Sequence, residues 1–128
     1  MTELDPEDFK LVTLARAAQL RAWAPHTKQP EGAAVRDTDG RTYSAGTVEN
    51  ADPTLTTSAL RGAVVAAASS GARSFEAAAI VVQEARTFDA ASAVHVREQD
   101  LAVLREFGAG VPVLLVDPNG AVHEVVTT

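Results

Sequence analysis

Residues 46–61 form the one stretch of the chain whose side chains and order could support chemistry. The stretch leaves a strand-like segment, crosses a polar loop that contains Glu49, and enters a helix-like segment through Ser58. The first amide groups of a helix point into the preceding loop and favour negative charge or polar ligands there. The strand, loop and helix order therefore predicts a functional site within this stretch.

Two other kinds of chemistry have weaker support in the sequence. Ser58 could act as a nucleophile, but no His lies near it in the pattern to activate it, and a helix-entry Ser that satisfies backbone amides explains it better. His95 could join Asp89 and Asp100 as metal ligands, but three ligands in an irregular segment make a weak signal, and scattered histidines are usually surface residues. The chain has three scattered histidines: His26, His95 and His123.

Composition excludes several classes of function. A length of 128 residues favours one domain over residues 1–128, and the net charge of -6, with no block of Lys and Arg, disfavours nucleic acid as a partner. No apolar run approaches the length of a membrane span, and the acidic start lacks the features of a signal peptide. Cysteine is absent, so disulfides and thiolate metal ligands are excluded. We therefore expect a cytoplasmic protein.

Turn and cap residues divide the chain into alternating elements. Asp37-Thr-Asp-Gly40 and Asp117-Pro-Asn-Gly120 predict two hairpin turns, Asp5 predicts a helix start, and Pro25 predicts a helix stop. Trp23 is interpreted as core or interface packing, and Gly46 as a point of close backbone approach. The predicted elements are a helix over 5–24, strands over 32–36 and 41–47, a helix from Thr56 or Thr57 to about Gly71, a strand over 75–82, an irregular segment over 83–96, a helix over 98–107, and strands over 111–116 and 121–126.

The same stretch resembles a segment of the cytidine deaminases, N-V-E-N-A-x-x-x-x-T-x-C-A-E-R. The pattern holds at Val48, Glu49, Asn50, Ala51, Thr56, Ala59 and Arg61. Further matches follow in order at 22–25, 32–34, 103–108 and 112–120. The resemblance implies an α/β protein: a three-layer α/β/α domain with a mixed five-stranded sheet, and an assembly similar to the family's homotetramer.

The resemblance also shows where this chain departs from the family's chemistry. The family binds zinc through ligands at the starts of two helices, and a Glu moves the proton. Ser58, Arg97 and Asp100 stand at the three ligand positions, and Leu60 stands at the proton shuttle. A neutral hydroxyl is a poor zinc ligand and a guanidinium is none. These replacements predict that zinc is absent.

The substrate side of the resemblance is partly altered. Gln29 stands where the family places a pyrimidine-lining Phe, and Thr47 stands in place of a ribose-binding Asn. Glu49 matches the ribose-binding Glu, although capping of local backbone amides is the preferred interpretation. Arg61 matches an Arg that contacts the zinc thiolates in the family. Because zinc's charge would be missing, we expect Arg61 or Arg97 to pair with Asp100 or Glu49.

Three functions follow from these residues. The first is a pseudoenzyme that serves as an interaction module or binds a nucleoside-like ligand weakly. The second is a deaminase of cytidine or a related nucleoside, or another hydrolase that uses Asp100 and Glu49. The third is a structural subunit that assembles with an active homologue. We expect a homo-oligomer, either dimer or tetramer, with an unidentified protein as a further possible partner.

Overall fold

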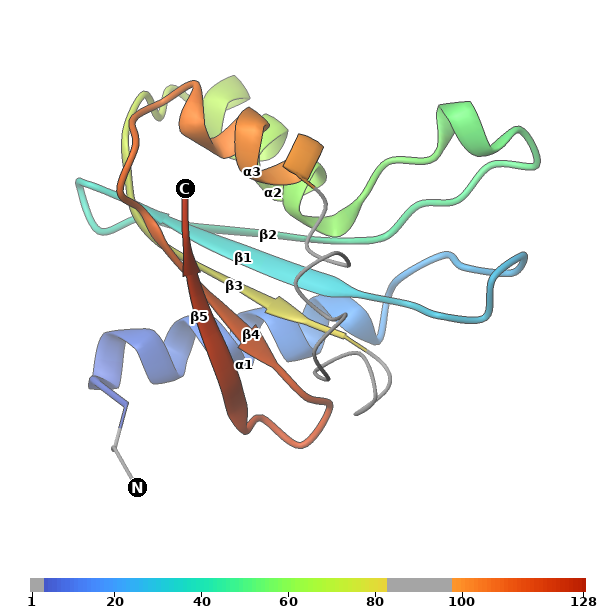
Figure 1. Cartoon of the computed structure of the whole chain (residues 1–128), viewed down its shortest axis with the longest axis horizontal. Coiled ribbons are helices and arrows are strands. Elements are labelled where there is room, and N and C mark those ends of the chain that lie inside the picture. Colours follow the sequence, from blue (N-terminus) through green and yellow to red (C-terminus); the bar gives the residue numbers. More distant parts are fainter. Residues whose placement is uncertain (1–3, 83–97) are drawn as a thin grey trace.

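The structure, a computed structural model, describes residues 4–82 and 98–128. Its central feature is a mixed five-stranded sheet in the order β2-β1-β3-β4-β5, in which β3 and β4 are parallel and the other neighbours antiparallel. The helix α1 covers one face, and α2 and α3 cover the other (Figure 1). The predicted α/β architecture is therefore confirmed. The elements are α1 Pro6–Gln19, β1 Gly32–Asp37, β2 Thr42–Gly46, the short 3-10 helix η1 Pro53–Leu55, α2 Ala59–Ser69, β3 Phe75–Val81, α3 Glu98–Arg105, β4 Pro112–Val116 and β5 Val122–Thr127.

The inner strands are apolar on both faces because each face is covered by helix. Along β3, Ala78 and Ile80 pack toward α2 and α3, whereas Ala79 and Val81 pack with α1 residues such as Leu11. This alternation is expected for a strand whose side chains point to opposite faces in turn. The apolar strand predicted over residues 75–82 is confirmed within one residue of its end.

The helices approach the sheet closely because small residues line the contact. A Cβ on Gly46 would lie 2.6 Å from the carbonyl oxygen of Ala18, which confirms the predicted close approach. A Cβ on Gly32 would lie 2.1 Å from the carbonyl oxygen of Ala15. Glycine at both positions lets the backbone of α1 lie directly on the ends of β1 and β2.

Both predicted hairpin turns use the same local chemistry. The Asp37 carboxylate accepts hydrogen bonds from the amides of Asp39 and Arg41, and Asp117 accepts equivalent bonds two and four residues on. Gly40 and Gly120 follow with φ values of 85° and 93°. An Asp followed three residues later by a Gly therefore encodes each turn locally.

Three sequence predictions about α1 and α2 need correction. The first helix ends at Gln19 rather than near residue 24. Trp23 is 61% exposed, so it lies outside the core of this chain, and its interface packing stays a prediction. The backbone of Trp23 is instead drawn into bonds with Thr47 and Glu49. The cap of α2 is Ser58 rather than Thr56 or Thr57, because Thr57 forms a bridge with Val48.

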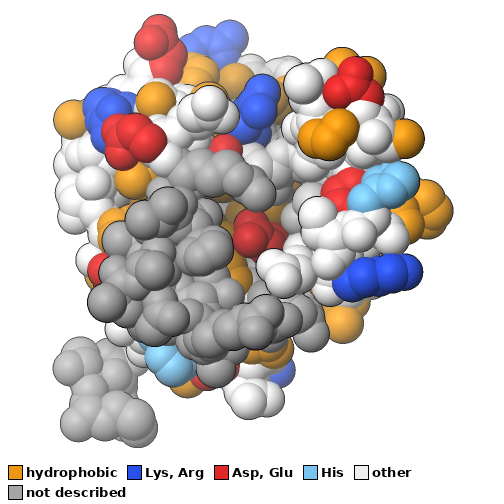
Figure 2. Space-filling view, turned by 45° about the vertical axis from the view of Figure 1, so that its right-hand side comes forward, with side chains coloured by type: hydrophobic (Ala, Val, Ile, Leu, Met, Phe, Trp, Pro, Cys, Tyr) orange, Lys and Arg blue, Asp and Glu red, His pale blue; other side chains and the backbone are white. Residues whose placement is uncertain are grey.

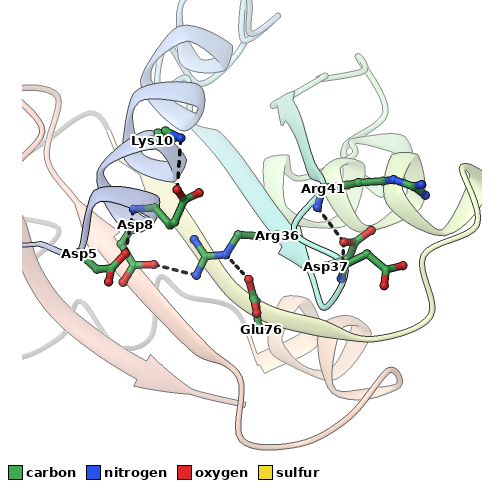
Figure 3. Close-up of polar contacts among 9 residues, drawn as sticks. Asp5, Asp8, Lys10, Arg36, Asp37, Arg41 and Glu76 are labelled. Carbon is green, nitrogen blue, oxygen red and sulfur yellow. Dashed lines mark hydrogen bonds and ion pairs between the residues drawn. The ribbon is translucent and has the colours of Figure 1, made fainter.

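A network of ion pairs connects α1 to the sheet. Arg36 of β1 donates from Nη2 to Asp8 of α1 at 3.0 Å and from Nε to Glu76 of β3 (Figure 3). Its side chain is only 12% exposed, and its Nη1 has no hydrogen-bond partner among the described residues. Loss of this guanidinium would leave two carboxylates facing each other.

Replacing Arg36 with alanine is expected to lower the free energy of unfolding by about 1–2 kcal/mol, between the values for exposed and buried ion pairs. Lys10→Ala is the matched control, because Lys10 pairs with Glu7 at an exposed site on α1. We expect that control to change stability by less than about 0.5 kcal/mol. Urea unfolding of both variants measures the difference, and equal midpoints would contradict a stabilising role for the network.

Candidate functional site

Two connecting segments meet beside the ends of β1 and β2. One joins α1 to β1 over residues 20–31, and the other joins β2 to α2 over residues 47–58; both project from the same end of the sheet (Figure 1). The amide of Trp23 donates to Thr47, and the amide of Glu49 donates to the carbonyl of Trp23, each at 2.8 Å. Val48 bridges both Trp23 and Thr57. These backbone bonds fix the position of Glu49 between the two segments.

The Glu49 carboxylate is held by three hydrogen bonds from the neighbouring segment. Its Oε1 accepts from the amides of His26 and Thr27, at 2.8 and 3.2 Å, and its Oε2 accepts from the Thr27 hydroxyl at 2.5 Å. Glu49 is only 7% exposed. These contacts agree with the preferred interpretation of Glu49 as a cap for local amides; ligand binding by Glu49 stays a prediction.

These bonds also favour the ionised form of Glu49. The hydroxyl of Thr27, followed by the two backbone amides and the charge of His26, lowers the pKa of Glu49 below its ordinary value, although burial acts in the opposite direction. The carboxylate is therefore charged at neutral pH and serves as a hydrogen-bond acceptor.

A cavity of about 380 Å³ opens over this carboxylate. Most of its lining residues have polar side chains, and they include three residues predicted from the sequence: Gln29, Thr47 and Glu49. Among the described residues, the lining consists of His26, Thr27, Gln29, Glu31, Thr47, Glu49, Asn50, Ala51, Pro53 and Thr56. We call this space the Glu49 cavity. Its polar groups suit a small ligand with several hydroxyl or amide groups.

Thr47 lines the Glu49 cavity, but its hydroxyl is hydrogen-bonded to the backbone of Glu31. The hydroxyl accepts from the amide of Glu31 at 3.1 Å and donates to the Glu31 carbonyl at 3.3 Å. Thr47 therefore ties the start of β1 to the end of β2. A ligand would compete with these contacts for the hydroxyl.

A second, smaller cavity of about 240 Å³ lies beyond η1. Pro53 and Thr56 form part of the wall of both cavities. The second cavity is lined by Pro53, Thr54, Thr56, Ser58, Arg61, Gln99 and Asp100. It thus brings together the predicted residues at the start of α2 with Asp100 of α3.

Ser58 and Asp100 contact each other directly in this second cavity. The Ser58 hydroxyl donates to Oδ1 of Asp100 at 2.7 Å, and the two residues are each 5% exposed. The same hydroxyl accepts from the amide of Arg61 at 3.3 Å and caps α2. The pair joins the first turns of α2 and α3 across 42 residues of sequence.

The predicted pairing of Arg61 with Asp100 or Glu49 is not found among the ion pairs of residues 4–82 and 98–128. Arg61 is exposed at the rim of the second cavity. The shorter Ser58 side chain reaches Asp100 from the cap position, so this contact forms instead. Arg97, the other predicted cation, lies outside the described residues, as do His95 and Asp89.

Leu60 belongs to the core rather than to either cavity. It is 1% exposed and packs in the cluster between the sheet and α2 and α3. An alkyl side chain has no proton to exchange. The position therefore contributes packing energy to this chain and no acid or base.

The described donors do not complete a metal site by themselves. Ser58 and Asp100 supply one hydroxyl and one carboxylate, whereas a catalytic zinc takes three protein ligands. Within residues 4–82 and 98–128, no cluster of three or more His, Cys, Asp or Glu side chains is arranged to hold a metal ion.

Comparison with known proteins identifies the family. A model described as cytidine deaminase-like matches residues 4–120. The chain belongs to the cytidine deaminase-like family. A cytidine deaminase of Sporosarcina psychrophila is 33% identical over 116 residues, which cover 90% of this chain and 81% of the relative.

Solved structures agree with this cytidine deaminase-like assignment. A cytidine deaminase from Burkholderia pseudomallei is 28% identical with a TM-score of 0.80, and the match covers 99% of this chain and 93% of that one. A second, from Mycobacterium tuberculosis, is 27% identical with a TM-score of 0.70, covering 87% and 85%. The fold and the family predicted from the sequence are both confirmed.

Family membership corrects one prediction. Zinc was expected to be absent because of the residue types at Ser58, Arg97 and Asp100, but the cytidine deaminases to which this chain is similar are zinc enzymes. The expectation is contradicted. Of the three positions on which that expectation was based, Arg97 lies outside the described residues.

The sequence reasoning did not identify Thr27 as a site residue. Its partner, Glu49, lies 22 residues further along the chain, so no short-range pattern connects them. The only available signal was a hydroxyl residue two positions after Pro25, in the loop that follows the first helix.

Proposed function

We propose that this cytidine deaminase-like protein binds a nucleoside in the Glu49 cavity and deaminates it slowly or not at all. One observation carries the binding part of the proposal: the buried Glu49 carboxylate, at the position that matches the family's ribose-binding Glu, lines a cavity whose lining residues are mostly of polar types. A sugar hydroxyl would donate to this carboxylate, and a charge-assisted bond of this kind is stronger than a neutral one.

Leu60 supports the second part of the proposal. It stands at the family's proton-shuttle position, and its buried alkyl chain neither donates nor accepts a proton. General acid–base catalysis contributes roughly 10²–10⁴-fold to a rate. A chain with Leu at this position is therefore expected to turn over a nucleoside more slowly than a relative with Glu by about that factor.

The alternative function is an active deaminase with unusual site residues. The relative from Sporosarcina psychrophila, 33% identical and named cytidine deaminase, favours this alternative. Deamination would then depend on groups other than Leu60. The two functions share the binding step and differ in turnover, so one experiment can separate them.

We also propose that the protein is a cytoplasmic homo-oligomer, a dimer or a tetramer. Several large apolar side chains are more than half exposed in the single chain, which supports burial against a partner. They include Leu20, Trp23, Val48, Leu55 and Val65. Assembly with an active homologue, or with a different protein, would use the same kind of surface.

Charge and hydropathy support a small-molecule partner over nucleic acid or membrane. On the described part of the face in Figure 2, Lys and Arg side chains lie at separate places and are mixed with Asp and Glu. Nucleic-acid binding needs a continuous basic surface. In the part of the chain that the structure describes, every helix is too short or too polar to cross a bilayer.

The binding proposal is tested by calorimetry with cytidine. Glu49→Gln replaces an acceptor-only carboxylate with an amide, and we expect it to weaken cytidine binding at least about tenfold. Glu106→Gln is the control, because Glu106 is exposed directly after the end of α3, and the affinity of this variant should stay within about twofold of the unsubstituted protein. Equal affinities for the two variants would exclude Glu49 as the ligand contact.

Turnover is measured on the same samples by uridine formation, with and without added Zn²⁺. The cytidine deaminase from Burkholderia pseudomallei serves as the reference enzyme. We expect binding with a rate about 10²–10⁴-fold below the reference. A rate equal to the reference would establish the deaminase alternative.

A further inference from the structure

Asn119 lies in the exposed turn between β4 and β5, directly before Gly120. The chain has two asparagines, and the other, Asn50, precedes Ala51. Asn119 is exposed, and its side-chain amide has no hydrogen-bond partner among the described residues. The side chain of Asn50, by contrast, accepts from the amide of Asp52 at 2.9 Å. The side-chain amide of Asn119 is therefore free to turn toward the backbone that follows it.

The order of Asn119 and Gly120 suits attack by the backbone on the side chain. The Gly120 nitrogen, after losing its proton to water, bonds to Cγ of Asn119 and closes a cyclic succinimide. The bond from Cγ to the side-chain nitrogen breaks and ammonia leaves, and water then opens the ring to aspartate or isoaspartate. Glycine has no Cβ to hinder the approach of its nitrogen, whereas Ala51 carries one after Asn50.

A guanidinium of α1 lies against the attacking group. Nε of Arg16 donates to the Pro118 carbonyl at 3.2 Å, and a Cβ on Gly120 would lie 3.2 Å from Nη1 of Arg16. A guanidinium stays charged in proteins. Its positive charge favours the deprotonated Gly120 nitrogen and the oxyanion that forms on the side chain of Asn119.

The closed turn acts against the reaction. The amide of Gly120 donates to the carbonyl of Asp117 at 2.9 Å, so this bond must break before the nitrogen can attack. The net contribution of one hydrogen bond corresponds to a factor of about ten or less. Exposed turns open locally at a small cost in free energy. Because the charge of Arg16 acts in the opposite direction, the folded turn should stay reactive.

We propose that Asn119 is a site of spontaneous deamidation in the folded protein and that the Arg16 guanidinium promotes the reaction. Deamidation at this turn does not depend on nucleoside binding. The aspartate product should fit the turn, because the first hairpin has Asp39 at the equivalent position before Gly40. In that hairpin, Asp37 accepts the same two backbone bonds.

The isoaspartate product should not fit the turn. It routes the backbone through the side chain of residue 119 and so lengthens the turn by one carbon. The Asp117 carboxylate accepts from the amide of Ala121 at 3.1 Å, across the lengthened segment. Loss of this bond would loosen the start of β5, so we expect a lower Tm for the isoaspartate form than for Asn119→Asp.

Ageing of the purified protein at mildly alkaline pH, followed by peptide mass spectrometry, tests the site. We expect Asn119 to deamidate within about tenfold of the rate of a synthetic peptide of residues 114–124. Asn50 should stay intact over the same period, and an isoaspartyl methyltransferase should label the aged protein. An intact Asn119 after the peptide has been fully converted, or equal rates at the two asparagines, would overturn the proposed site.

The role of the guanidinium is tested by Arg16→Gln, which removes the charge from an exposed position of α1. We expect deamidation of Asn119 to slow about threefold to tenfold, the effect of one nearby charge at a solvated site. Arg21→Gln is the matched control, because Arg21 is exposed beyond the end of α1, and it should leave the rate within about twofold. If Arg16→Gln deamidates as fast as the original protein, or faster, the guanidinium does not promote the reaction.

Discussion

Replacing Gly32 with alanine is expected to lower the free energy of unfolding by at least about 3 kcal/mol, at the upper end of overpacking effects. The added Cβ would lie 2.1 Å from the Ala15 carbonyl oxygen and 2.4 Å from the Gln19 amide nitrogen. Both are backbone atoms of α1, so no side-chain rotation relieves the overlap. The helix would have to move away from β1 and expose the core cluster that contains Leu11.

Gly62→Ala is the matched control for this prediction. The added Cβ on Gly62 would meet the Ala45 side chain at 3.0 Å, while alanine in the middle of α2 gains helix propensity. These opposing effects should leave stability within about 1 kcal/mol of the original. Thermal unfolding followed by circular dichroism measures both variants. A Gly32→Ala protein with an unchanged Tm would show that α1 does not lie on β1 at this distance.

Replacing Ser58 with alanine is expected to cost about 2–4 kcal/mol, the sum of a lost helix cap and a lost hydrogen bond to a charged group. The hydroxyl accepts from the Arg61 amide and donates to the buried carboxylate of Asp100. Alanine removes both contacts and leaves an unfilled space between α2 and α3. The two helices should separate more easily at their first turns.

Ser70→Ala provides the comparison for Ser58→Ala at the other end of α2. Ser70 is exposed, and its hydroxyl donates to the Ala66 carbonyl at 2.9 Å. Its replacement should change stability by less than about 0.5 kcal/mol. Chemical unfolding gives the two free energies, and amide hydrogen exchange in α3 shows whether its first turn opens. Equal effects of the two substitutions would exclude a structural role for the Ser58–Asp100 bond.

Most of the fold could be predicted because its signals are local. The turns at Asp37 and Asp117 each depend on a side chain and a glycine within four residues. The start of α1 depends on Asp5, whose side chain accepts from the Glu7 amide. Apolar strands and amphipathic helices are likewise recognised from the spacing of apolar residues over short stretches of sequence. Such elements need no knowledge of distant residues.

The errors occur where distant backbone groups compete with a local preference. Helical spacing continues past Gln19, but Trp23 forms backbone bonds with Thr47 and Glu49 and cannot remain in the helix. Thr57 is a good cap by type, but its amide and carbonyl pair with Val48, so Ser58 takes the cap position. In both cases, long-range bonds replace those that a helix would have supplied.

The sequence by itself determined the family, the order of elements and the residue types at the candidate site, including Leu60 and Glu49 at the positions that match the family's proton shuttle and ribose-binding Glu. Only the tertiary structure decided which groups are partners. Ser58 meets Asp100 across 42 residues and Thr27 meets Glu49 across 22. The residue type of a hydroxyl or carboxylate side chain does not identify its hydrogen-bond partner. The bond depends on the distance between the two side chains, and only the packing of the helices and loops sets that distance.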